Sequence, residues 1–325
     1  MAADGGTKAV VAALLANTGI AITKFIAFFL TGFSSMLAEA IHSVADAGNQ
    51  ALLLVGGKRA KREATPEHPF GFGRERYVYS FIVAIVLFTL GGLFALYEAY
   101  HKWHELDAGH GDDMFASQWR WVPLVVLGIA IVLESFSMRT AVIETNKVRG
   151  DKSYWQFIRQ AKSPELPVVL LEDVAALLGL IFAFVAVAAA LLTENAIFDV
   201  IGTGLIGVLL VVVAVVLAIE VKSLLLGESA TPESNARIRA ALESTPGVDR
   251  VIHMKTLHIA PEELLVAVKI AISASTTGAD VARTIDAAEA AMRAAEPMAA
   301  SVYIEPDIDR GPAAPTTPAP PAQDR

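Results

Sequence analysis

The stretch that decides the fold is IFDVIGTGLIGVLLVVVAVVLAI at residues 197–219, in which Asp199 is the only charged residue. A helix needs about 20 apolar residues to cross a hydrocarbon core of about 30 Å. Five similar stretches lie upstream, at approximately 9–30, 35–57, 78–100, 121–137 and 166–192. The sequence therefore predicts six transmembrane helices.

The composition points to the same class of protein. Of the 325 residues, 54% are hydrophobic and 18% are charged, whereas a soluble domain carries about 25% charged residues. The net charge of −8 argues against nucleic acid as a partner, because phosphate binding needs a basic surface. The absence of cysteine excludes disulfides and thiolate metal sites.

The basic residues predict how the helices are oriented. They gather between the second and third stretches and between the fourth and fifth, whereas the other connections are neutral or acidic. By the positive-inside rule, both termini are then cytoplasmic. We expect a multi-pass protein of the cell (inner) membrane. The basic residues are Lys58, Arg59, Lys61, Arg62, Arg74 and Arg76 in the first loop, and Lys147, Arg149, Lys152, Arg159 and Lys162 in the second.

The chain changes character after Gly227. Thr231 and Pro232 are typical of a helix N-cap and first turn, and strands are expected at 248–259, 264–272 and 301–305, with a helix at 280–295. The order αββαβ predicts a small α+β domain with its helices on one face of a sheet. We expect a transmembrane domain over 1–227, this cytoplasmic domain over 228–309 and a disordered Pro/Ala-rich tail over 310–325.

Ionisable residues inside the predicted helices indicate where the chemistry lies. Each costs about 3 kcal/mol at mid-bilayer, so they should converge inside the bundle. His42 and Asp46 are four residues apart and share one helix face, and Glu172 and Asp173 lie in the fifth stretch. Imidazole nitrogen and carboxylate oxygen suit Zn²⁺, and ligand type alone also admits Mn²⁺, Fe²⁺ or Co²⁺. The alternative is that these groups only join helices by hydrogen bonds.

Three motifs together resemble the cation diffusion facilitator family, closest to the branch related to zinc transporter 9. They are HSVAD at 42–46, HPFGFGRERY at 68–77 and LEDVAALLG at 171–179, with a GES exit from the sixth stretch at 227–229. The resemblance covers nearly the whole chain. It implies a dimeric divalent-metal/proton exchanger whose cytoplasmic domain is similar to a metallochaperone.

The resemblance also implies a ligand set. The two ligands of the second helix match His42 and Asp46, and the aspartate of the fifth helix matches Asp173. The histidine four residues before that aspartate falls on Val169, which cannot bind metal. Two possibilities remain open: Glu172 substitutes for the missing ligand, or the site has three protein ligands and a water molecule.

Other histidines are weaker candidates. Relatives bind metal in the loop that holds His68, but Phe72 stands where a second histidine would be, and Tyr303 replaces a ligand of the cytoplasmic domain. His253 and His258 are five apart on a predicted strand and so face opposite sides. Solvated loop residues are the simpler reading of three further histidines, His101, His104 and His110.

We therefore expect efflux of a divalent metal ion, Zn²⁺ first, by metal/proton antiport through a mid-membrane site of His42, Asp46, Asp173 and Glu172. The transported ion is cargo, and no permanently bound cofactor is expected. The resemblance implies a homodimer joined through 228–309 in a lipid bilayer. The alternatives are a proton-coupled carrier of a non-metal solute, a regulatory or scaffold protein without transport, and an intramembrane enzyme. No metalloprotease-type HExxH pair, activated nucleophile or P-loop supports enzymatic activity.

Overall fold

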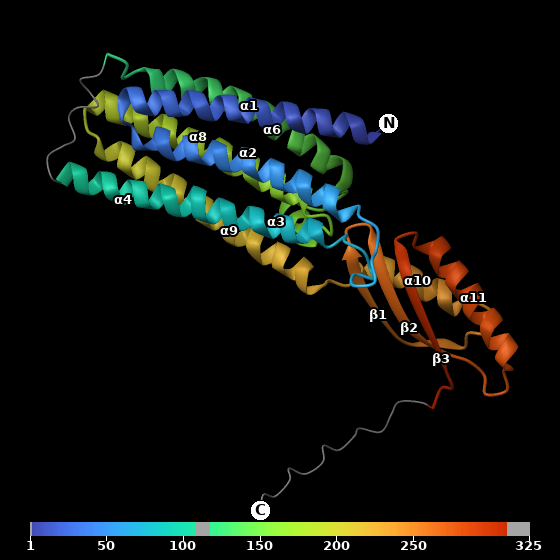
Figure 1. Cartoon of the computed structure of the whole chain (residues 1–325). Helices are drawn as coiled ribbons and strands as arrows, with labels where there is room; N and C mark the ends of the chain where they lie inside the picture. Colours follow the sequence, from blue (N-terminus) through green and yellow to red (C-terminus); the bar gives the residue numbers. More distant parts are fainter. Residues whose placement is uncertain (1, 108–117, 311–325) are drawn as a thin grey trace, which may run out of the picture. The chain divides into compact units, whose positions relative to one another are not determined.

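The computed structural model describes residues 2–107 and 118–310, with side chains from residue 17 onward. It divides into two compact units, Met1–Leu226 and Gly227–Arg325, which are described separately below (Figure 1). Two expectations concern residues outside the described ranges. They are His110 and nearly all of the predicted tail, at 311–325.

The first unit consists mainly of long helices (Figure 1). One continuous helical stretch contains a seven-residue π-helical segment, η1, which was not expected from the sequence. Such segments occur where a helix accommodates a local irregularity. The elements are α1 (Ala2–Thr31), α2 (Ser34–Ala60), α3 (Glu75–Val86), η1 (Leu87–Leu93), α4 (Phe94–Asp107), α6 (Val122–Val148), α7 (Tyr154–Gln160), α8 (Glu165–Thr193) and α9 (Ile197–Leu226).

The structure contains a long helical stretch at each of the six positions where a membrane-crossing helix was predicted. Four described stretches are long and apolar enough to span a bilayer on their own: Glu75–Asp107, Val122–Val148, Glu165–Thr193 and Ile197–Leu226. The other two are α1 and α2, which pack against each other. The apolar character of α2 is diluted by its polar stripe, and the shorter apolar helix Asn17–Thr31 lies within α1. Several helices extend beyond the predicted stretches, because the backbone hydrogen bonds of a helix continue past its apolar residues.

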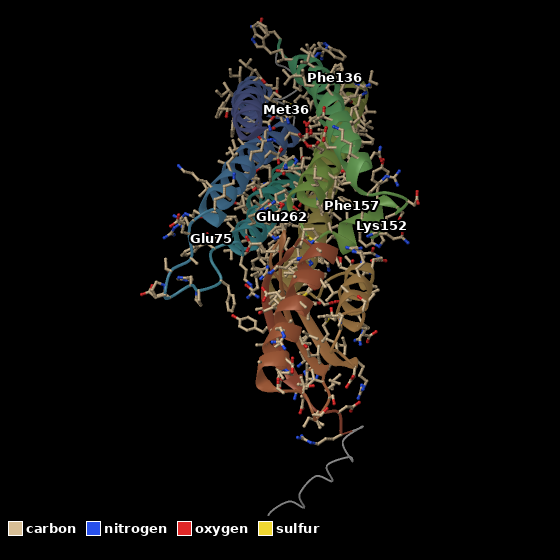
Figure 2. The ribbon with its side chains drawn as sticks, turned by 90° about the vertical axis from the view of Figure 1, so that its right-hand side faces the viewer. Met36, Glu75, Phe136, Lys152, Phe157 and Glu262 are labelled. Carbon is tan, nitrogen blue, oxygen red and sulfur yellow. The ribbon has the colours of Figure 1, made fainter. Side chains whose placement is uncertain are left out.

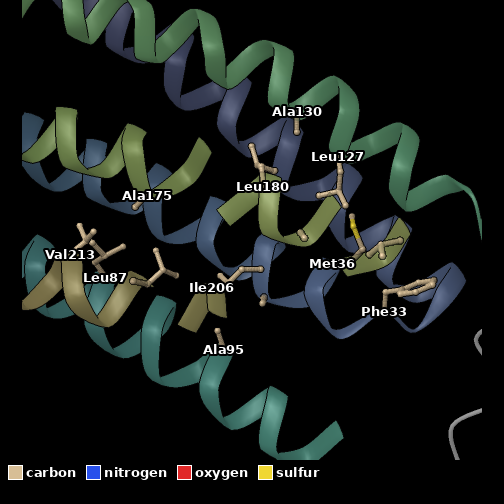
Figure 3. Packing of buried hydrophobic residues seen from close by; sticks show 14 of the residues in the cluster. Phe33, Met36, Leu87, Ala95, Leu127, Ala130, Ala175, Leu180, Ile206 and Val213 are labelled. Atoms are coloured by element: carbon tan, nitrogen blue, oxygen red, sulfur yellow. The ribbon is translucent and has the colours of Figure 1, made fainter. Parts of the chain in front are cut away.

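Small residues set the distances between these helices. A Cβ atom added at Gly202 of α9 would lie 2.2 Å from the Cβ of Ala186 in α8, and one at Gly207 would lie 2.8 Å from Leu96 in α4. Such approaches are typical of membrane helices, which associate through close van der Waals packing. Figure 3 shows the resulting core, where Leu180 of α8 lies near Leu127 of α6, and Ile206 of α9 lies between helices.

The connection between α6 and α8 contains α7, which begins with a capping box. The Ser153 hydroxyl accepts a hydrogen bond from the Gln156 amide, and the Gln156 side chain accepts one from the Ser153 amide. Phe157 is buried. In Figure 2, Lys152 and Phe157 lie on the opposite side of the bundle from Glu75 at the start of α3.

The second unit is the expected αββαβ domain. Its elements are α10 (Pro232–Glu243), β1 (Arg250–Ala260), β2 (Glu263–Ala271), α11 (Gly278–Ala295) and β3 (Ala299–Asp307). The sheet order is β1-β2-β3, with β1 antiparallel and β3 parallel to β2. The Thr231 hydroxyl caps α10 by accepting from the Ser234 amide at 3.2 Å, and Pro232 is the first helical residue.

One hydrophobic core holds this unit together. Ile238 and Leu242 of α10 and Met292 of α11 pack with Leu264 and Val266 of the central strand β2. Because α10 and α11 also contact each other, both helices cover the same face of the sheet, as the alternation of apolar residues predicts.

Candidate metal site

The polar stripe of α2 faces the interior of the helical unit. His42 and Asp46 lie one turn apart, with side chains 1% and 13% exposed, and their Nδ1 and Oδ1 atoms are 3.5 Å apart. Glu39 and Asn49 on the same helix are fully buried. The helical spacing that suggested a shared face therefore corresponds to a buried polar stripe.

Several atoms of this stripe are buried but have no hydrogen-bond partner among the described residues. They include both ring nitrogens of His42, Oδ1 of Asp46, Oδ1 of Asn49 and Oε1 of Gln50. The 3.5 Å approach between His42 and Asp46 is too long for a good hydrogen bond. Each unsatisfied buried group costs about 1–3 kcal/mol, so their concentration here indicates a place that accepts a ligand.

Helix α8 brings Glu172 to this stripe. The Glu172 side chain is buried, and its Oε1 accepts a hydrogen bond of 2.9 Å from Nδ2 of Asn49. The carboxyl groups of Glu172 and Asp46 also interact directly with each other. Two carboxylates and an imidazole from two helices thus line one buried region.

Asp173 has a different environment. Its Oδ2 accepts a hydrogen bond of 3.2 Å from the hydroxyl of Ser137 in α6, and the carboxylate of Glu134 in the same helix lies close to it. Consecutive residues on a helix point about 100° apart, so Glu172 turns toward α2 while Asp173 turns toward α6. Within the described residues, no three His, Asp or Glu side chains are gathered closely enough to hold a metal ion.

Valine stands at the position of α8 where the resemblance implies a histidine, and its neighbours are apolar too. Val169 packs against a cluster of Ala141, Ile158 and Leu170. A side chain in this environment contributes no ligand. The third acidic residue of α8, Glu165, is paired with Arg76, which leaves Glu172 and Asp173 as the candidate ligands.

Two charged residues near the stripe were not singled out from the sequence. Lys24 of α1 is 3% exposed, and its Nζ donates to Oε2 of Glu39 at 2.9 Å and to the hydroxyl of Ser43 at 2.8 Å. Glu134 of α6 adjoins Asp173. The signal for Lys24 was available, because it is the only lysine or arginine within the six predicted stretches.

The other described histidines of the first unit are not part of the polar stripe of α2. His68 lies in the exposed loop after α2 and contacts Phe72 with ring centroids 4.6 Å apart. His101 and His104 are exposed in α4. In the second unit, His253 is exposed and His258 is buried, so the two face opposite sides as predicted, and Tyr303 is exposed.

Comparison with known families gives two matches that together cover most of the chain. Residues 10–226 match the family described as "Cation efflux transmembrane domain". Residues 230–307 match "Cation efflux protein, cytoplasmic domain". These matches confirm the resemblance drawn from the three motifs.

Curated relatives support the same grouping. The chain is 32% identical over 251 residues to the protein named "Proton-coupled zinc antiporter SLC30A9, mitochondrial" from Mus musculus, which covers 77% of this chain and 43% of the relative. It is 28% identical over 256 residues to "Metal tolerance protein C4" from Arabidopsis thaliana, covering 78% and 54%. A shorter match, 26% identical over 140 residues, is to "Magnetosome protein MamM" from Paramagnetospirillum magneticum, covering 41% of this chain and 40% of that one. The chain thus spans about half or less of the length of each.

Proposed function

We propose, from the premise that this chain belongs to the cation efflux family, that it carries a divalent metal ion across a membrane in exchange for protons. A relative named as a proton-coupled zinc antiporter supports both the type of cargo and the coupling. We propose Zn²⁺ as the first cargo, because one imidazole and several carboxylates match its preferred ligands. The same donors accept Mn²⁺, Fe²⁺ or Co²⁺.

One observation carries the proposed site. Both ring nitrogens of His42 are buried without a hydrogen-bond partner in the described residues, one turn from Asp46, which itself interacts with Glu172. A buried imidazole with two free nitrogens is costly unless it binds something. We assign His42, Asp46 and Glu172 as the primary ligands.

Asp173 is assigned a place at the edge of this site. Its hydrogen bond to Ser137 and its neighbour Glu134 hold it toward α6. Because the three primary ligands are not yet gathered around one point, we propose that the ion draws α2 and α8 together. Water or Asp173 then supplies the fourth ligand.

The chemistry of these ligands accounts for exchange with protons. Imidazole nitrogen and carboxylate oxygen bind a metal ion only when deprotonated, so a proton and a metal ion compete for the same atoms. Protons arriving from one side release the ion, and loss of those protons to the other side makes the site ready again. No ATP is needed for this cycle, and nothing in the sequence resembles a P-loop.

The proposed orientation, assembly and location rest on the basic loops and on the second unit. The basic loops favour a cytoplasmic location of both termini by the positive-inside rule, and the second unit matches a family domain described as cytoplasmic. We propose a homodimer joined through this domain. The cell (inner) membrane remains our proposal for its location, and one relative is named as mitochondrial.

Zn²⁺ uptake by proteoliposomes under an imposed pH gradient tests the proposed function. The purified full chain should move Zn²⁺ against its gradient, with proton counterflow reported by a trapped pH dye. His42→Ala and Asp46→Ala should each reduce this flux at least about 100-fold, as expected for loss of a metal ligand. His101→Ala, which alters an exposed imidazole of α4, is the matched control and should transport normally.

The result also separates the alternatives. Undiminished flux in both ligand variants would overturn the assigned site. Binding of no divalent ion by a folded chain, measured calorimetrically with Zn²⁺ and Mn²⁺, would favour a carrier of a non-metal solute or a protein without transport.

A further inference from the structure

Lys24 forms an unusual buried ion pair beside the proposed site. It is the only buried lysine or arginine in the part of the chain that the structure describes. Its Nζ donates to Oε2 of Glu39 at 2.9 Å, to the Ser43 hydroxyl at 2.8 Å and to the Glu39 carbonyl oxygen at 3.4 Å. An ammonium group has three donors, so these three oxygen atoms match its donors in number.

The second carboxylate oxygen of Glu39 is left free. Oε1 is buried and has no hydrogen-bond partner among the described residues. It points toward α8, because a Cβ atom added at Gly179 would lie 2.8 Å from it. A glycine at this position keeps space open beside the free oxygen, and any other residue would intrude on it.

Glu39 lies on the same surface between α2 and α8 as the proposed ligands. We call this surface the α2–α8 seam. It is defined by Glu39, His42 and Asp46 of α2 and by Glu172 and Gly179 of α8. The contacts of Asp46 with Glu172 and of Glu39 with Gly179 show that the two helices run antiparallel. Glu39 is seven residues from Asp46, or about 10 Å along the helix. From Asp46, it lies in the direction away from the basic last turn of α2, which holds Lys58 and Arg59.

We propose that Glu39 is a second cation-binding position on the α2–α8 seam, which we call the station. The Lys24 ammonium occupies the station when no metal ion is there. A metal ion leaving His42, Asp46 and Glu172 displaces the ammonium. This inference rests on the proposed function. The oxygen atoms that hold Lys24 are carboxylate, carbonyl and hydroxyl groups, all of which bind divalent ions. The free Oε1 adds a further ligand on the side of the seam.

The charges and the geometry allow this exchange. Lys24 supplies one positive charge to Glu39 and a metal ion supplies two, so the carboxylate is never left buried and unpaired, which would be costly. The displaced ammonium has a flexible four-carbon stem. The Glu134 carboxylate of α6 is within electrostatic reach of Lys24, and it offers an alternative partner. Lys24 thus keeps the station neutral and limits how long an ion stays there.

The test compares binding with transport in the full chain. The double variant Lys24→Met/Glu39→Gln replaces the ion pair with neutral side chains of similar size. It should still bind Zn²⁺ at the first site, because His42, Asp46 and Glu172 are unchanged. The substitutions remove one positive and one negative charge beside His42 together, so the affinity should stay within about tenfold of the unmodified chain. Its Zn²⁺ flux in proteoliposomes should fall about tenfold or more, in the range found when a supporting group of a metal site is removed.

A second variant exposes the station directly. Lys24→Met alone removes the ammonium partner of Glu39, and equilibrium dialysis with radioactive zinc should then show one additional Zn²⁺ per folded chain. If this variant fails to fold, the double variant decides the question. Three results would overturn the station: flux in the double variant within about twofold of the unmodified chain, loss of its first-site binding, or no additional Zn²⁺ in folded Lys24→Met. Failure of the proposed function is distinct, because the unmodified chain would then bind no Zn²⁺.

Discussion

Two buried regions of the helical unit differ in how well their ionisable side chains are paired. At the start of α2, Asp199 of α9 accepts hydrogen bonds from the amides of Ser34 and Ser35, at 2.7 and 3.2 Å, and from the Ser35 hydroxyl. Along the α2–α8 seam, Glu39, His42 and Asp46 all retain unpartnered buried atoms within the described residues. We infer that the first region holds helices together and that the second is built to bind an ion.

Asp199→Ala should have the largest effect on stability. The amides at the start of a helix have no partner within it, and Asp199 supplies one from a different helix. Removing it leaves two amides and a hydroxyl unpaired, so the free energy of unfolding should fall by about 3 kcal/mol or more. Denaturation of the purified chain in detergent measures this loss.

Asp151→Ala, which changes an exposed loop carboxylate, is the control and should leave unfolding unchanged. Zn²⁺ affinity per folded molecule should also be normal in Asp199→Ala. A stable Asp199→Ala protein that no longer binds Zn²⁺ would reverse the assignment of the two regions.

His42→Leu should behave in the opposite way. It replaces an imidazole whose two nitrogens lack partners with an apolar side chain, so the free energy of unfolding should stay within about 1 kcal/mol or rise. Zn²⁺ affinity should fall at least about 100-fold, which corresponds to about 2.7 kcal/mol. Thermal unfolding and calorimetric titration of the same sample measure both quantities. A marked loss of stability would mean that His42 is a structural residue.

The Zn²⁺ affinities of Glu172→Gln and Asp173→Asn test whether these two neighbouring residues of α8 have different roles. Glu172 meets Asn49 and Asp46 of α2, whereas Asp173 meets Ser137 of α6. Zn²⁺ affinity should fall about tenfold or more in the first variant and only a few-fold in the second. Equal losses would place Asp173 among the primary ligands, and a larger loss in Asp173→Asn would contradict the assignment.

The smallest effect is expected at an exposed and well-paired carboxylate, Asp280 in the first turn of α11. The Thr277 hydroxyl, and then Arg283, lower the pKa of Asp280 below its ordinary value of 3.8. The stabilisation is therefore present above that value and is lost as the pH falls through the lowered pKa. Asp280→Asn should reduce the melting temperature at pH 7 by about 1 °C, with the difference disappearing in strong acid. A difference in melting temperature that grows as the pH falls would contradict this pH dependence.

The architecture could be predicted from the sequence because it depends on local patterns. Apolar length indicated the membrane helices, and alternation at 264–272 indicated the central strand. The polar face of α2 followed from the spacing of His42 and Asp46. These features need only the order of residues along one element.

The composition of the seam could not be predicted in the same way, because it depends on how helices rotate against each other. The sequence matched Asp173 to a ligand and left Glu172 as a possible substitute, whereas the packing of α8 turns Glu172 toward Asn49 of α2 and Asp173 toward Ser137 of α6. Lys24 was overlooked because one charge scarcely changes the hydropathy of a long apolar stretch. Its partner Glu39 lies in another helix, and no pattern within either helix links them.

Anomalous scattering from crystals of the full chain soaked in Zn²⁺, measured on both sides of the zinc absorption edge, tests the central claim most directly. We expect a zinc peak between α2 and α8, with a ring nitrogen of His42 and carboxylate oxygens of Asp46 and Glu172 at about 2.0–2.2 Å. A fully occupied zinc peak elsewhere in the helical unit, with His42 remote from it, would contradict the assignment of this site.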